Sequence, residues 1–348
     1  MTSVSAPAGT RPRLASLRGR GLIDAGPVAG VAGLAVLAAA VALPFLPGIS
    51  FYYLQVGILV FWYAILGTSW TVAGGYGGLH SIGHATFVGI GAYTSTLLYA
   101  DFGVTPWLGL LAGMGLAALV AVLIGYPCFR AGIRGDYFAL VTVALGQVAY
   151  EIANGATAVT KGSQGAVVPY AGTSFADFQF GNRTQFYYAV MVMWLIAVMI
   201  AYRMRRSHFG LQLAAVRDDE VAALRGGISP IRRKLAALAL SAAIAAAAGT
   251  FYAQFFLFVD PGSVFGISLS VQIVLMAVLG GMNSYLGGTV GALILVPLSQ
   301  YLATTFNAHP GIDVASYGVV LVLLTLYLPY GLLGLLRHSP RWRGVVGW

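Results

Sequence analysis

Long, nearly uncharged apolar stretches restrict the possible folds of this chain more than any other feature. Cut at turn residues and charges, the 348-residue sequence gives ten such stretches. A helix rises about 1.5 Å per residue and needs roughly 20 apolar residues to cross a bilayer, so these stretches predict repeated membrane crossings. The predicted spans lie near residues 27–48, 51–72, 77–100, 105–126, 136–154, 184–203, 235–258, 267–282, 285–307 and 315–336.

The predicted fold class is all-α. A segment inside a bilayer must pair all of its backbone N–H and C=O groups, which only helices and closed barrels achieve. A barrel would show alternating segments of about ten residues, and the sequence has none. We therefore expect a polytopic membrane protein of about ten transmembrane or re-entrant helices, with the glycine-rich segment 77–100 either crossing or entering and returning. The small residues of 242–249 and the Gly287-x-x-x-Gly291 spacing predict close helix packing.

The positions of the basic residues predict the orientation, because basic loops stay in the cytoplasm. With both termini cytoplasmic, only Lys161 and Arg183 of the 19 Lys and Arg residues lie outside. The predicted layout is a basic N-terminal tail, a transmembrane domain with an outer loop and a large cytoplasmic loop, and a basic C-terminal tail. The N-terminal tail is 1–26, the transmembrane domain is 27–336 and the C-terminal tail is 337–348. Within the transmembrane domain, the outer loop is 155–183 and the cytoplasmic loop is 203–234.

The sequence also excludes several functional classes. Only 8% of residues are charged, so the net charge of +9 is assigned to membrane topology and no nucleic-acid partner is expected. Neither of the two lysines, Lys161 and Lys234, follows a glycine as a phosphate-binding loop requires. A single cysteine, Cys128, excludes an intrachain disulfide. Because only Glu151 among the acidic residues lies within a span, we expect energy from a partner protein in place of an ion gradient.

The cytoplasmic loop 203–234 contains a short amphipathic run, 211–225, that predicts one helix. Gly226-Gly227 can end this helix, and Ser229-Pro230 can begin the next. Such a helix between two hinges could be a lever for a partner, or could lie among lipid headgroups with its bases on anionic lipid. At about 100° per residue, the residues expected on one face are Leu213, Val216, Glu220 and Leu224, with Asp218 and Arg225 pointing away.

Several motifs in order resemble those of the membrane-spanning permease of branched-chain amino acid ABC importers, over roughly residues 50–335. Residues 77–87 (GGLHSIGHATF) with 89–93 (GIGAY) resemble the family's G-x-x-S-x-G-H-A-x-F segment and its G-x-G-A-Y continuation. Residues 134–142 (RGDYFALVT) resemble its R-G-x-Y-x-A-x-V-T helix entry, 215–223 (AVRDDEVAA) its ATPase-contacting loop, and 278–282 (VLGGM) a late glycine pair. Two departures are His80, where the family has a smaller or amide residue, and 328–331, which lacks the usual arginine.

The resemblance implies a non-enzymatic transport subunit of the bacterial inner membrane that has no cofactor of its own. Its implied partners are a homologous second permease, two ATP-binding cassette subunits that bind ATP and Mg, and an extracytoplasmic solute-binding protein. It also implies that the coupling helix seated in an ATPase groove consists of Arg217, Asp218, Asp219, Glu220, Val221, Ala222, Ala223 and Leu224.

Polar residues within or near the spans are candidates for the substrate pathway, because such groups tend to face a water-filled cavity. On a helix, His80 and His84 would share one face. Two histidines alone do not make a metal site, because a bound metal would need further ligands. An equal alternative to a role in the pathway is that both imidazoles form hydrogen bonds with backbone carbonyls. Gln147 could instead bond to a neighbouring helix or to the outer loop. The candidates are His80, Ser81, His84, Gln147, Glu151, Gln272 and Asn283, with no metal site assigned.

The low charge of the spans favours a small neutral or zwitterionic cargo, because a strongly charged one would need compensating groups. Branched-chain amino acids are the first expectation for the cargo. Urea, short amides and aromatic acids use similar permeases, and the sequence does not distinguish them from branched-chain amino acids. Two other classes also stay open: a stand-alone channel or secondary carrier, and an intramembrane metalloenzyme built on His80 and His84. ATP-independent flux would indicate the first, and stoichiometric metal the second.

Overall fold

The computed structural model describes residues 38, 40–45, 50–305, 318 and 331–335. These residues are mostly helical. The only paired strands among them form a two-residue antiparallel ladder in which Ala166 lies opposite Val259. The predicted all-α class is therefore correct for the part of the chain that the structure covers.

The helices and strands follow one another as a series of long helices joined by shorter elements. The long helices are α2 (Phe51–Trp70), α3 (Ala85–Phe102), α4 (Pro106–Arg130), α5 (Gly135–Gly155), α7 (Arg183–Arg206), α10 (Pro230–Phe256), α12 (Ile267–Gly280) and α13 (Gly287–Thr305). The shorter elements are η2 (Leu43–Phe45), the π-helical turn η3 (Thr71–Gly75), α6 (Thr157–Thr160), η4 (Gly162–Gln164), β1 (Ala166–Val167), α8 (His208–Asp218), α9 (Glu220–Arg225), β2 (Phe258–Val259), α11 (Pro261–Phe265) and α15 (Leu332–Leu335).

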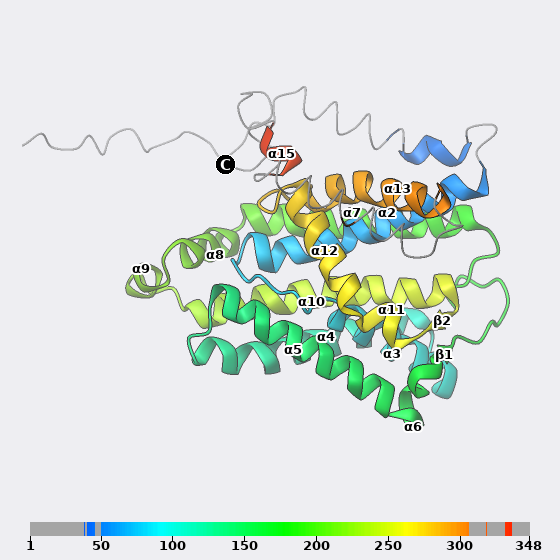
Figure 1. Ribbon diagram of the computed structural model, residues 1–348, viewed down its shortest axis with the longest axis horizontal. Helices are drawn as coiled ribbons and strands as arrows, with labels where there is room; N and C mark the ends of the chain where they lie inside the picture. The colour runs from blue at the N-terminus through cyan, green and yellow to red at the C-terminus, as the bar shows by residue number, and fades with distance from the viewer. Residues whose placement is uncertain (1–37, 39, 46–49, 306–317, 319–330, 336–348) are drawn as a thin grey trace, which may run out of the picture.

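Most of the long helices run along the long axis of the molecule (Figure 1). The helices α8 and α9 lie at one end of this bundle, and α6, β1 and β2 lie at the other. The cytoplasmic loop and the outer loop predicted from the basic residues thus occupy opposite ends. This arrangement is the one required if the helices cross a membrane between those ends.

Among the described residues, six helical segments are long and apolar enough to span a membrane. These segments are Phe51–Gly75, Pro106–Arg130, Arg183–Arg206, Pro230–Phe256, Pro261–Gly280 and Gly287–Thr305. The helices α3 and α5 match two more of the predicted spans but contain more hydroxyl, glycine and acidic residues. The predicted spans 27–48 and 315–336 lie mostly outside the described residues, as do both predicted tails, 1–26 and 337–348.

Small residues allow the helices to approach closely, as predicted for residues 242–249. A methyl group on Gly91 of α3 would collide with the backbone of Ala246 in α10, and one on Gly249 with Val88 of α3. A Cβ on Gly67 of α2 would lie 2.7 Å from the Cα of Gly288 in α13. Because lipid gives no hydrophobic force between helices, such backbone contact is what holds them together.

The segment 77–84 is not helical, so the predicted span 77–100 begins too early. The helix of α2 continues through η3, and regular helix resumes only at Ala85. Between them the backbone finds partners on other elements: the indole N–H of Trp70 donates to the Ser81 carbonyl (2.7 Å), and the amide of Ile82 donates to the Thr142 hydroxyl (3.1 Å). A broken helix is tolerated at membrane depth only where such protein partners replace the lost ladder.

Candidate functional site

The predicted coupling helix is divided at Asp219, so the prediction of one continuous helix over 211–225 is wrong. Asp219 has extended backbone angles (φ −154°, ψ 108°), and its carboxylate accepts hydrogen bonds from the amides of Val221 (2.8 Å) and Ala222 (3.0 Å). Aspartate favours this N-cap conformation because its short side chain satisfies amides that have no partner in the first turn. The helix α8 therefore ends at Asp218, and α9 begins at Glu220.

The break changes which side chains face the protein. Leu213 and Val216 are fully buried, as predicted for the apolar face. Leu224, expected beside them, is 61% exposed, while Ala223 is buried in its place. Val221 is also exposed. The helix α9 thus presents apolar side chains to the outside at the tip of the bundle.

The predicted end of this helix at the glycine pair and the predicted start of the next helix are both confirmed. The helix α9 ends at Arg225, and Gly227 adopts the left-handed conformation (φ +82°) that lets the Ile228 amide donate back to the Ala223 carbonyl (2.9 Å). The next helix, α10, has Ser229 at its N-cap and Pro230 as its first residue.

Glu220 points into the protein and is held by two cations. One carboxylate oxygen lies 2.9 Å from the guanidinium of Arg134, the residue just before α5, and the other pairs with Lys234 in the second turn of α10. Only 19% of the Glu220 side chain and 8% of the Lys234 side chain are exposed. A buried ammonium needs a charged partner, so Glu220 stabilises Lys234 as well as connecting three helices.

Arg217 joins the end of α8 to two segments distant in sequence. Its guanidinium donates to the carbonyl of Gly75 (3.0 Å) and to the side-chain oxygen of Asn283 (3.1 Å), and it pairs with Asp218 (3.3 Å). Gly78 has a positive φ of 65°, and a Cβ there would lie 2.9 Å from Cγ of Arg217. The structure therefore places Asn283 beside the coupling segment, away from the other pathway candidates on α5 and α12.

These contacts surround a cavity of about 560 Å³ at this end of the bundle. Its wall combines glycine backbone from 74–78 with cationic, anionic and amide side chains. The polar lining residues include His80, Arg134, Arg217, Glu220, Lys234 and Asn283. The cavity thus brings two predicted pathway residues, His80 and Asn283, into the same site as the coupling residues.

The two histidines do not share a helix face, because residues 77–84 are not helical. The prediction that they do is therefore wrong. His80 stacks on Trp70, with ring centroids 6.3 Å apart and planes at 15°. His84 is fully buried at the start of α3, with Nε2 2.8 Å from the hydroxyl of Ser69. That hydroxyl donates to the Ser241 carbonyl (2.7 Å), so the imidazole is the donor to it. The expected backbone-carbonyl partner of His84 is replaced by this serine.

The remaining pathway candidates lie on α5 and α12. Gln147 and Glu151 are exposed on α5, where the Gln147 amide donates to the Glu151 carboxylate (2.8 Å) and does not bond to a neighbouring helix. Gln272 on α12 is half-buried and accepts a hydrogen bond from the Tyr63 hydroxyl (2.6 Å). Within the described residues, no three His, Cys, Asp or Glu side chains lie close enough to hold a metal ion.

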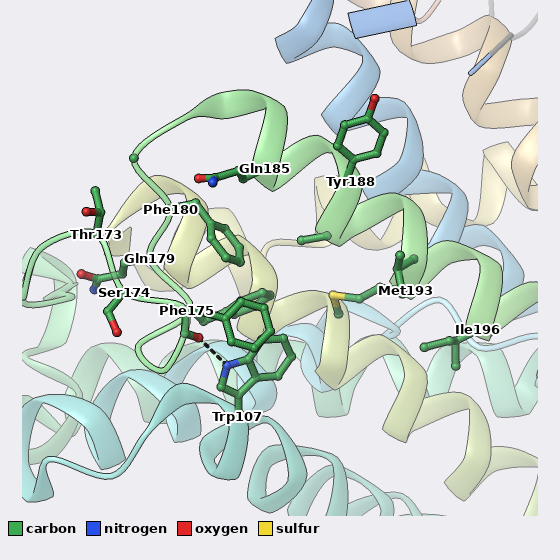
Figure 2. Close-up of a pocket in the computed structure, with 14 residues that line it drawn as sticks. Trp107, Thr173, Ser174, Phe175, Gln179, Phe180, Gln185, Tyr188, Met193 and Ile196 are labelled. Atoms are coloured by element: carbon green, nitrogen blue, oxygen red, sulfur yellow. Dashed lines mark hydrogen bonds between the residues drawn. The ribbon is translucent and has the colours of Figure 1, made fainter. Parts of the chain in front are cut away.

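A second cavity, of about 660 Å³, lies at the opposite end, between the outer loop and α7 (Figure 2). Its wall includes an aromatic cluster: the Trp107 ring contacts those of Phe175 and Phe178 at tilted angles, and its indole N–H donates to the Phe175 carbonyl (2.8 Å). Sequence reasoning missed this cavity, although the three phenylalanines within 175–180 are a signal that could have found it.

Comparisons with known proteins agree on one family. The family model described as the permease component of the branched-chain amino acid transport system matches residues 52–328. The high-affinity branched-chain amino acid transport system permease protein LivM of Escherichia coli K12 is 33% identical over 328 residues, covering 87% of this chain and 75% of LivM. LivH of Salmonella typhimurium LT2, a permease protein of the same kind of system, is 27% identical, covering 78% of this chain and 91% of LivH. No solved structure matches the chain significantly.

Proposed function

Because this chain belongs to the family of branched-chain amino acid transport system permease components, we propose that it forms one half of the transmembrane pathway of an ATP-driven importer. The chain is a transport permease and not an enzyme. The proposed cargo is a small neutral or zwitterionic solute, and branched-chain amino acids are the first candidates. The proposed location is the bacterial inner membrane, with about ten spans and both termini in the cytoplasm.

The observation that carries this proposal is the exposed apolar tip of α9. Val221 and Leu224 face outward there, on a short helix that follows the break at Asp219 and ends before Gly226. We propose that a partner protein covers these two side chains. We therefore assign the ATPase contact to the outward face of α9, together with the exposed Asp218 of α8.

The proposed partners follow from the same family. Escherichia coli K12 has two related permease proteins, LivM and LivH, and both resemble this chain. We propose that a second, homologous permease supplies the other half of the pathway, two ATPase subunits bind the cytoplasmic end, and a solute-binding protein delivers cargo outside. The proposed layout keeps 155–183 outside and 203–234 in the cytoplasm.

We propose that α5 and α12 line the pathway through Gln147, Glu151 and Gln272. The exposed polar pair on α5 supports this role, because polar side chains of membrane helices favour water over lipid. Ser81, His84 and Asn283 are instead engaged in contacts within the chain or close to the coupling segment.

The test is uptake by the reconstituted importer. Vesicles containing both permeases and the ATPases, with binding protein outside and ATP inside, should accumulate labelled leucine, and accumulation should stop with a non-hydrolysable nucleotide. Flux of leucine through this chain alone, without nucleotide, would contradict the proposal and support a channel or carrier. Competition by unlabelled urea or phenylalanine would instead reassign the cargo.

A further inference from the structure

The strongest unassigned feature is the ion cluster that holds α9 against the bundle. Its members are Arg134, Glu220 and Lys234, and each comes from a different helix or helix entry. Sequence resemblance placed Glu220 on the surface that touches the ATPase. Its side chain faces the opposite way, toward α5 and α10.

We infer that Glu220 is a positioning residue that passes the movement of α9 to α5 through Arg134, while Lys234 of α10 supports it. This inference rests on the proposed function, because it assumes that the ATPase moves α9. One face of α9 would receive the movement through Val221 and Leu224, and the other would transmit it through Glu220.

The position of Arg134 makes it suited to act on α5. Arg134 is the N-cap residue of α5, so its backbone cannot move without moving the first turn of that helix. A pull on the Arg134 guanidinium therefore reaches α5 directly.

The packing of α5 makes it the helix most able to respond. Tyr137, Leu140, Val148 and Ile152 are exposed along its length. By contrast, α10 buries residues along most of its length against α3 and α4. We infer that α5 moves while α10 serves as the fixed support at Lys234. Because α5 carries Gln147 and Glu151, its movement would change the face that we propose lines the pathway.

The variant that isolates the transmission step is Arg134→Gln. The Arg134 side chain is 59% exposed, so its loss should leave the fold intact, whereas Glu220→Gln would leave the buried Lys234 ammonium unpaired. The matched control is Arg130→Gln, the same change at an exposed arginine at the end of α4, whose guanidinium donates to the Tyr126 hydroxyl (3.1 Å).

The measurement is the number of leucine molecules imported per ATP hydrolysed by the complete importer in vesicles. Arg134→Gln should lower this ratio about fivefold or more, the usual size of a coupling between two sites, while ATPase subunits still co-purify at wild-type amounts. Arg134→Lys should recover most of the ratio, because it restores the charge. Arg130→Gln should leave the ratio unchanged.

A triple variant separates transmission from simple stability. If the three residues act in one connection, Arg134→Gln combined with Glu220→Gln and Lys234→Met should lower the ratio no further than Arg134→Gln alone. A wild-type ratio in Arg134→Gln, or a loss matched by lost ATPase co-purification, would overturn the inference while leaving the proposed function standing. Absence of ATP-driven uptake in the wild-type importer would overturn both.

Discussion

Replacing Leu224 by alanine should weaken ATPase binding without destabilising the permease. The substitution removes three carbon atoms, worth roughly 0.8 kcal/mol per CH₂ group when fully buried, or about 2.4 kcal/mol in all. The side chain is 61% exposed in the isolated chain, so a partner that covers it gains about 1.5 kcal/mol of this. At about 1.4 kcal/mol per tenfold, the dissociation constant should rise about twelvefold.

The assay is equilibrium binding of the purified ATPase to the permease pair in lipid nanodiscs, with thermal unfolding of the permease measured in parallel. The matched control is Leu211→Ala, which removes the same atoms from a leucine that is 49% exposed on α8, before the break at Asp219. The control should bind the ATPase as tightly as the wild type. The midpoint of unfolding should be the same in all three proteins.

Two results would refute the assignment of the outward face of α9 to the ATPase. The first is an unchanged dissociation constant for Leu224→Ala, which would mean that the side chain stays uncovered in the complex. The second is an equal loss of affinity for Leu211→Ala, which would mean that the contact is not specific to α9. The alternative in which α9 lies among lipid headgroups predicts the first result.

Three further substitutions test the structure of the bundle. Asp219→Ala should destabilise α9 by about 1 kcal/mol, because the helix loses its N-cap, whereas Asp219→Asn should preserve the cap. The expected readout is faster amide hydrogen exchange at 221–225 in the alanine variant alone. Gly67→Leu should prevent folding, because its Cβ would lie 2.7 Å from the Gly288 backbone, whereas Gly115→Leu, which meets open space, should give a normal size-exclusion peak. Leu213→Ala should lower stability by about 2–5 kcal/mol because the side chain is fully buried, and an unchanged unfolding midpoint would contradict its role as the anchor of α8.

The fold class and the helix order could be predicted because apolar length and basic residues are local properties of the sequence. The long helices between residues 51 and 305 overlap spans predicted from composition, although the span 77–100 was predicted to begin too early. The end of α9 and the start of α10 followed from Gly226-Gly227 and Ser229-Pro230. Turn chemistry of this kind depends on adjacent residues alone. The family also followed from short motifs whose order in the chain is fixed.

The division of α8 from α9 could not be predicted from periodicity, because the apolar spacing of 211–225 fits one helix. The signal against one helix was present in Asp218-Asp219 followed by Glu220, since aspartate in a helix interior competes for backbone amides. Tertiary contacts decide between one helix and two. With the break at Asp219, the Glu220 carboxylate reaches Arg134, 86 positions before it, and Lys234, 14 positions after it. Sequence spacing carries no information on such contacts.

The same reasoning explains the broken helix at 77–84 and connects it to α5. Consecutive glycines at 77 and 78 are compatible with close packing of a regular helix or with its interruption. The interruption is stable here because Thr142 of α5 accepts the Ile82 amide hydrogen bond and because Gly83 has no side chain to collide with the Thr142 carbonyl. The middle of α5 is therefore tied to the broken segment, while its first turn is tied through Arg134 to α9. A displacement of α5 caused at α9 would consequently reach the residues before His84, which connects the α9 end of the bundle to its centre without any movement of α10.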